Sequence, residues 1–173
     1  AVLEAIAPHP LGPARALEAL LPRLPDEAPV FVSYCDYGMV WDPEQFERFV
    51  RQTECDACVV SYRGFHPHYL SQLTYAYSRM SGGLVREVRE KGSFTDDRQT
   101  EFASAGGYYF RTARLLREAL QHQRAEDLRV NGEYYTSLTV EALLRLRPAA
   151  RVTVFEVPHF FQWGTPDELR NFT

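Results

Sequence analysis

The segment from residue 29 to residue 64 most constrains the fold, because two apolar stretches enclose an amphipathic one. "PVFVSYCD" is rich in β-branched and aromatic residues and predicts a buried strand whose end is marked by Asp36 and Gly38. An N-cap, a first-turn proline and a first-turn acid in "DPE" predict a helix from Pro43 to Arg51. "DACVVSYRG" predicts the next strand. Strand, helix and strand within about 35 residues form a βαβ unit, so we expect an α/β fold with parallel neighbouring strands.

The rest of the chain predicts further helices, a β-hairpin and two more strands. These elements are a helix opened by Gly12-Pro13, a hairpin turning at "SGG" (81–83), a short strand at "SAGGYYFR", helices at 112–123 and 133–146, a strand at "RVTVFEV", and a last helix beginning at "GTPDEL" with Asp167 as a helix-dipole partner.

The composition is that of an ordinary folded domain. A length of 173 residues suits one domain, residues 1–173, and a formal net charge of −4 argues against a nucleic-acid partner. No apolar run approaches the ~20 residues of a membrane span, so we expect no membrane insertion. Three cysteines, Cys35, Cys55 and Cys58, are odd in number and lack the further ligands of a zinc site. We expect buried or half-buried structural thiols in a reduced, cytoplasmic protein.

Four pieces, read in order, resemble the sugar nucleotidyltransferase (NDP-sugar pyrophosphorylase-like) family. They are "VFVSYCD", "VREVREKG", "SAGGYYFR", and "NGEYYTSLTVEALL" leading to "FQWGTPDELRNF". Members of that family join a sugar 1-phosphate to an NTP and release pyrophosphate. The resemblance implies a Rossmann-like α/β domain with a mostly parallel twisted sheet, to which this chain adds its β-hairpin. It also implies that NTP and a sugar phosphate are the partners and that Mg²⁺ is the cofactor.

The resemblance assigns three charged residues to the reaction. Asp36 matches the strand-end acid that ligates the metal, although an aspartate here also suits a turn that bonds the backbone near Gly38. Glu90 matches a glutamate that bonds sugar hydroxyls, and Lys91 matches the lysine that meets the sugar phosphate. Aligning two anions requires such carboxylates and cations, so Asp36 and Lys91 are the expected catalytic residues.

Four more residues match substrate-binding positions of the family. Gly106 and Gly107 match the strand that lets the sugar lie against backbone, and glycine also suits a plain strand entry. Glu133 matches an acid that starts a helix and faces the sugar, or serves only as a first-turn dipole partner. Gly12 resembles the small residue near the base and ribose, but the following Pro13 deletes a backbone donor.

Two departures from the family pattern affect the expected site. The N-terminal glycine-rich loop that cradles the triphosphate is not found in this sequence. We therefore expect either a partial domain whose N-terminal portion lies upstream of Ala1, or a homologue that has lost nucleotide activation. Gln162 stands two residues before Gly164, where many members carry a second metal aspartate, and an amide is a poorer Mg²⁺ ligand than a carboxylate.

Three functions follow as hypotheses. The first is a nucleotidyltransferase that makes an NDP-sugar, or a similar activated polyol or choline precursor, for cell-surface polysaccharide; a homo-oligomer is compatible with it. The second is a non-catalytic domain that binds a sugar nucleotide or a protein partner. The third, a related glycosyltransferase, would be expected to show an acid-x-acid motif at the strand end, which "CDYGM" lacks.

Overall fold

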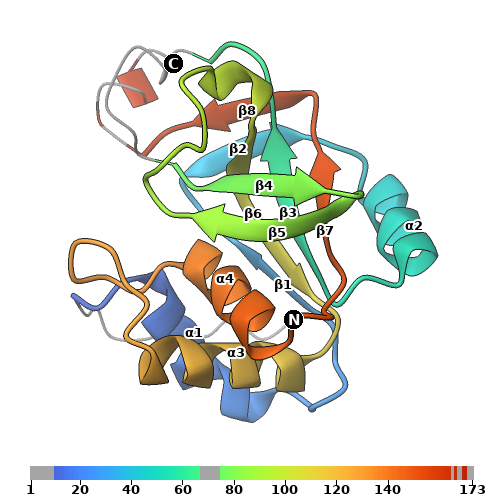
Figure 1. The fold of residues 1–173 in the computed structure, drawn as a ribbon, viewed down its shortest axis with the longest axis vertical. Helices are drawn as coiled ribbons and strands as arrows, with labels where there is room; N and C mark the ends of the chain where they lie inside the picture. Colours follow the sequence, from blue (N-terminus) through green and yellow to red (C-terminus); the bar gives the residue numbers. More distant parts are fainter. Residues whose placement is uncertain (1–9, 67–74, 165, 167–168, 171–173) are drawn as a thin grey trace.

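The structure, a computed structural model, describes residues 10–66, 75–164, 166, 169 and 170. A six-stranded sheet forms its centre, and a separate two-stranded sheet lies beside it (Figure 1). The central strands are β1 (Val30–Ser33), β3 (Ala57–Tyr62), β4 (Tyr77–Ser81), β5 (Leu84–Arg89), β6 (Phe102–Phe110) and β7 (Val152–Glu156). The small sheet pairs β2 (Tyr37–Val40) with β8 (His159–Gln162). The helices are α1 (Pro13–Leu20), α2 (Pro43–Thr53), α3 (Ala113–Ala125) and α4 (Thr136–Leu146), with 3₁₀ turns η1 (Leu21–Arg23) and η3 (Arg98–Thr100).

Local capping chemistry explains where the helices begin. The Asp42 carboxylate accepts a hydrogen bond from the Glu44 amide at 2.9 Å, and Pro43 occupies the first turn of α2. The Thr112 hydroxyl accepts from the Leu115 amide at 3.1 Å at the start of α3. The predicted helices at both places are confirmed, as are the hairpin β4–β5 and the strand β7.

The α/β class is confirmed, but the strand pairing differs from the expected parallel neighbours. β1 and β3 run in the same direction, yet β6 lies between them and is antiparallel to both. β4 also pairs with β6 antiparallel, and of the described pairs in the central sheet only β3 with β7 is parallel. β6 follows the β4–β5 hairpin, runs in the same direction as β5, and pairs with the opposite edge of β4, which places it antiparallel to β4, β3 and β1. Its nine residues make it longer than the short strand expected at "SAGGYYFR".

The small sheet was not predicted, because its strands are far apart in the sequence. The sequence pattern predicts a strand end at Gly38, whereas Gly38 lies inside β2 opposite Phe161 of β8. A Cβ at Gly38 would come within 3.1 Å of Cζ2 of Trp163, so the absent side chain makes room for the indole ring. The pairing brings the segment around Asp36 next to the segment around Gln162.

Alternation along β3 divides the core into two layers. Ala57 and Val59 belong to a cluster that packs on α1, α3 and α4, which lie together in Figure 1. Cys58, Val60 and Tyr62 belong to a second cluster that includes Phe46 of α2. Successive strand residues point to opposite faces, so helices cover both faces of the sheet. None of the helices formed by the described residues has the length and hydropathy needed to cross a lipid bilayer.

Two local expectations were wrong and one falls outside the described residues. Glu133 does not start a helix: Asn131 and Gly132 both have positive φ, and this tight turn pairs Glu133 with Val130 before α4 begins at Thr136. Cys35 is exposed because β1 ends at Ser33, whereas Cys55 and Cys58 are buried as predicted. Half of the segment "GTPDEL" at which a helix is predicted, including Asp167, lies outside the described part of the chain.

Candidate active site

Lys91 is the second residue after the end of β5 and has an unusual backbone conformation. Its φ is +54°, a left-handed value that costs a lysine about 1 kcal/mol, and its amide donates to the Tyr75 carbonyl at 3.0 Å. Lys91 is also the only lysine among the 19 basic side chains of the sequence. The one side-chain amine of the sequence therefore stands at a position whose backbone conformation would suit glycine better.

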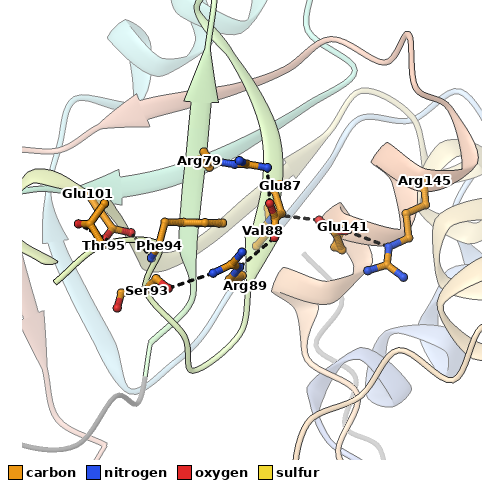
Figure 2. A network of polar contacts seen from close by, with 10 residues as sticks. All are labelled: Arg79, Glu87, Val88, Arg89, Ser93, Phe94, Thr95, Glu101, Glu141 and Arg145. Atoms are coloured by element: carbon orange, nitrogen blue, oxygen red, sulfur yellow. Dashed lines mark hydrogen bonds and ion pairs between the residues drawn. The ribbon is translucent and has the colours of Figure 1, made fainter. Parts of the chain in front are cut away.

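Helix α4 fixes the end of β5 through a buried carboxylate. Glu141 accepts a hydrogen bond from the Val88 amide at 2.8 Å and from Arg145 at 2.9 Å (Figure 2). Glu87 of β5 forms ion pairs with Arg79 of β4 and with Arg89 of its own strand. An unpaired buried carboxylate would be costly, so Glu141 binds α4 firmly to the strand that presents Glu90 and Lys91.

The loop that follows Lys91 is held by a second carboxylate. Glu101 accepts from the Phe94 amide at 2.9 Å, and from the amide and hydroxyl of Thr95, each at 2.7 Å (Figure 2). The guanidinium of Arg89 lies 4.3 Å from the centre of the Phe94 ring. This loop therefore returns to the sheet in a defined path, and Lys91 has a rigid support on both sides.

A chain of polar contacts joins Lys91 to Glu133. The Lys91 Nζ donates to the Tyr135 hydroxyl at 2.6 Å, and that hydroxyl donates to the Glu133 carboxylate. Burial, and then the hydrogen bond to Glu133, raise the pKa of Tyr135, so it stays a neutral donor. The structure thus brings together Lys91 and Glu133, which lie 42 positions apart in the sequence, and Tyr135, which sequence analysis missed, links them.

Gly12 lies against the segment that carries Glu133. Its φ is +87°, and a Cβ there would lie 2.8 Å from the backbone nitrogen and oxygen of Tyr134. The Tyr134 amide donates to the Leu11 carbonyl and its carbonyl accepts from the Ala14 amide, both at 2.9 Å. In the structure Gly12 therefore supports the turn before α4, because only glycine permits this close backbone approach.

Gly106 and Gly107 face opposite sides of β6. Gly106 has φ of +77°, and a Cβ there would overlap Cδ2 of Tyr37 and lie 3.0 Å from its Cε2, so the Tyr37 ring covers this glycine. Gly107 faces Val60 and Phe31 instead. Gly106 lies where the register between β3 and β6 shifts, between the pairs Val60–Gly107 and Ser61–Ser104, and of the two glycines it alone lies beside the candidate site.

Asp36 is an exposed residue at the junction between β1 and β2. Its carbonyl accepts from the Trp163 amide at 2.8 Å, and the next residue, Tyr37, is paired with Gln162. Tyr75 donates its hydroxyl to the Gln162 side-chain oxygen. Across the described part of the chain, no three His, Cys, Asp or Glu side chains gather in a way that would hold a metal ion by themselves. The candidate metal ligands from the protein are therefore the carboxylate of Asp36 and the amide of Gln162, whose oxygen already accepts a hydrogen bond from Tyr75.

Glu90, the residue before Lys91, is half-buried against helix α4. Its carboxylate accepts from the Ser137 hydroxyl of α4. Burial raises the pKa of Glu90 to about 7, the hydrogen bond from Ser137 and the charge of Lys91 oppose that rise, and the charge of Glu133 adds to it. Glu90 therefore changes its protonation state near neutral pH.

This raised pKa predicts how stability depends on pH. The folded state binds the Glu90 proton more tightly than the unfolded state, so its contribution is fully present below about pH 4.5 and is lost as the pH rises to about 7. Allowing for the partial exposure of Glu90, we expect a loss of roughly 2 kcal/mol. Urea unfolding at pH 5 and pH 8 should show this loss in the parent protein and not in Glu90→Gln, whose amide can still accept from Ser137. Parallel pH profiles for the two proteins would show that Glu90 does not titrate in this range.

Tyrosine side chains line most of a small cavity that also contacts Glu90. A cavity of about 50 Å³ is lined by Tyr34, Tyr37, Tyr75, Ala76, Glu90, Ser104, Tyr108 and Tyr135. Sequence analysis did not select these tyrosines for the site, because they come from four separate segments.

Comparisons with known proteins support the resemblance at the level of fold. The sequence matches no family model, and comparison with curated proteins found no match. A nucleoside-diphosphate-sugar pyrophosphorylase from Vibrio cholerae superimposes with a TM-score of 0.67 at 18% identity, covering 93% of this chain and 64% of that one. A Bacillus anthracis protein described as a glucose-1-phosphate thymidylyltransferase, solved with sucrose, gives 0.66 at 15%, covering 93% and 59%. The chain therefore has the fold of sugar nucleotidyltransferases and spans about three fifths of the length of these structures.

Proposed function

We propose that this protein is a nucleotidyltransferase that joins a phosphorylated acceptor to the nucleotidyl group of an NTP and releases pyrophosphate. The observation that carries the proposal is the contact chain from Lys91 through Tyr135 to Glu133, with Glu90 beside it, on a fold shared with sugar nucleotidyltransferases. In this proposal the Lys91 amine binds the acceptor phosphate, and the carboxylates of Glu90 and Glu133 bind polar groups of the acceptor. In this role the product is an activated precursor for cell-surface polysaccharide, made in the cytoplasm where NTPs are supplied.

Mg²⁺ fits the donor set only when substrate phosphates complete its coordination. Mg²⁺ is usually held by one or two carboxylates together with phosphate oxygens and water, and Asp36 supplies one exposed carboxylate. Gln162 is already engaged by Tyr75. When bound, the ion would supply neutralisation of phosphate charge. We propose Asp36 as its protein ligand, with Lys91 supplying the second positive charge.

The proposal is tested by pyrophosphate release from an NTP in the presence of Mg²⁺ and a phosphorylated acceptor, using the full-length protein. Asp36→Ala should lower the rate about 100-fold, because a lost metal ligand removes several kcal/mol of charge stabilisation. Glu47→Ala, which removes an exposed carboxylate on α2, is the matched control and should leave the rate unchanged. A normal rate in Asp36→Ala would remove Asp36 from the reaction.

A second function, non-catalytic binding of a sugar nucleotide, is favoured by one observation. Gln162 stands where a second carboxylate would complete a two-acid metal site, and it is held by Tyr75. A protein that binds an NDP-sugar in calorimetry but releases no pyrophosphate with any NTP and acceptor would support this alternative over the enzyme.

A further inference from the structure

The cavity beside Glu90 is too small for a sugar ring. Its volume of about 50 Å³ corresponds to about four water molecules, since a buried water needs about 10–15 Å³ of such volume. A hexose ring with its hydroxyls has about three times as many heavy atoms. The Tyr37 ring also covers Gly106, the position at which a sugar was expected to lie against the backbone. A group of four or five heavy atoms fits this space.

Tyrosines are the majority of the residues that line the cavity. Tyr108, Tyr34, Tyr37 and Tyr75 follow one another with ring centres 6.1, 5.7 and 5.8 Å apart. Successive rings are tilted by 57°, 50° and 35°, so they do not stack flat on one another. Tyr135 lines the same cavity. Aromatic rings arranged around a small space attract a cation through their quadrupoles.

Carboxylates and an amine lie at different sides of the contact chain that borders the cavity. Glu90 lines the cavity itself, and Glu133 is held one contact away by the hydroxyl of Tyr135. Lys91, the next residue after Glu90, holds the same hydroxyl and is the group proposed above to bind phosphate. A ligand that carries an ammonium group at one end and a phosphate at the other would therefore meet a carboxylate with the first and an amine with the second.

From this geometry we propose that the tyrosine cavity binds the ammonium head of a small phosphorylated amino alcohol, with a quaternary or methylated nitrogen, as the acceptor of nucleotidyl transfer. The identity of the acceptor rests on the proposed function, whereas binding of the cationic head does not. The transfer is balanced: a phosphate oxygen of the acceptor forms a bond to the α-phosphorus of the NTP, and the bond from that phosphorus to pyrophosphate breaks.

The first test compares ligands by calorimetry with the full-length protein. Phosphocholine is expected to bind at least about 10-fold more tightly than glucose 1-phosphate. Choline is expected to bind at least about 5-fold more tightly than 3,3-dimethylbutanol, its uncharged isostere, because cation–π attraction depends on the charge. Equal binding of choline and the isostere, or tighter binding of glucose 1-phosphate, would overturn the inference.

The second test uses variants of the cavity wall. Tyr34→Leu should weaken choline binding at least about 5-fold, whereas Tyr34→Phe keeps the ring and should remain within about 2-fold of the parent protein. Tyr109→Leu is the matched control, since Tyr109 packs against Phe46 on the other face of β6. Thermal unfolding would confirm that each variant is folded. Equal losses in Tyr34→Leu and Tyr109→Leu would contradict a role for the cavity.

The two hypotheses fail in different ways. If choline binds with the expected preference but phosphocholine and NTP yield no pyrophosphate, the cavity assignment stands and the proposed enzyme falls. If pyrophosphate is released with glucose 1-phosphate and not with phosphocholine, the enzyme stands and the inference falls. If neither choline nor phosphocholine binds, the inference is overturned.

Discussion

Replacing Lys91 by glycine is expected to lower the rate of pyrophosphate release about 1,000-fold while leaving the free energy of unfolding within about 1 kcal/mol of the parent value. The rate falls because the amine proposed to bind the acceptor phosphate is lost. The fold survives because glycine relieves the left-handed backbone at φ of +54°, which offsets the lost contact with Tyr135. Initial rates and urea unfolding of the same preparations measure both effects.

Glu54 provides a matched control for this substitution. It also has a left-handed backbone, with φ of +48°, at the C-terminal cap of α2. Glu54→Gly should raise the free energy of unfolding by roughly 0.5–1 kcal/mol and leave the rate unchanged. A Lys91→Gly protein that retained more than about a tenth of the parent rate would exclude Lys91 from phosphate binding.

Replacing Gly106 by alanine is expected to lower the free energy of unfolding by roughly 3 kcal/mol, the largest stability effect in the site. Two costs add: alanine is strained at φ of +77°, and its Cβ would overlap the Tyr37 ring, which must move. Since Tyr37 also lines the cavity, the Gly106→Ala protein should lose choline binding as well as stability. Urea unfolding measures the first effect and calorimetry the second.

Gly82 separates the two costs of this substitution. Gly82 has φ of +60° in the β4–β5 turn, and apart from its two chain neighbours no heavy atom of the described residues lies within 4 Å of the position that an alanine Cβ would take there. Gly82→Ala therefore reports the backbone strain alone, about 1 kcal/mol. The double variant Gly106→Ala with Tyr37→Ala removes the overlap and should recover stability relative to the sum of the two single changes. Strict additivity would show that Tyr37 and Gly106 are not in contact.

Features written in adjacent residues could be predicted from the sequence. The N-cap Asp42, the first-turn Pro43 and the Gly82-Gly83 turn each predicted an element that the structure confirms. The Asn131-Gly132 turn could be predicted in the same way, because Asn-Gly favours a tight turn. Such a turn is incompatible with a helix that begins at Glu133.

Features that depend on distant pairing could not be predicted in this way. Nothing in "SAGGYYFR" specifies that β6 lies between β1 and β3, and β2 and β8 are separated by most of the chain. For the site, the resemblance drew attention to Glu90, Lys91 and Glu133, which the structure brings together, although their roles stay proposals. The different surroundings of Gly106 and Gly107 depend on the irregular register between β3 and β6, which the sequence of β6 does not specify.

The single lysine gives the protein a spectroscopic label of its own. Reductive methylation with ¹³C-formaldehyde would place an NMR-active dimethylamine on the side chain of Lys91. No other side chain of this sequence would react, because the other 18 of its 19 lysine and arginine residues are arginines. The chemical shift of that one amine reports on the hydroxyl of Tyr135 and, through it, on the carboxylate of Glu133. The same reaction methylates the α-amino group at the start of the chain, so the Lys91 resonance is identified as the one that is missing from a Lys91→Arg protein, and it then reports on the centre of the candidate site.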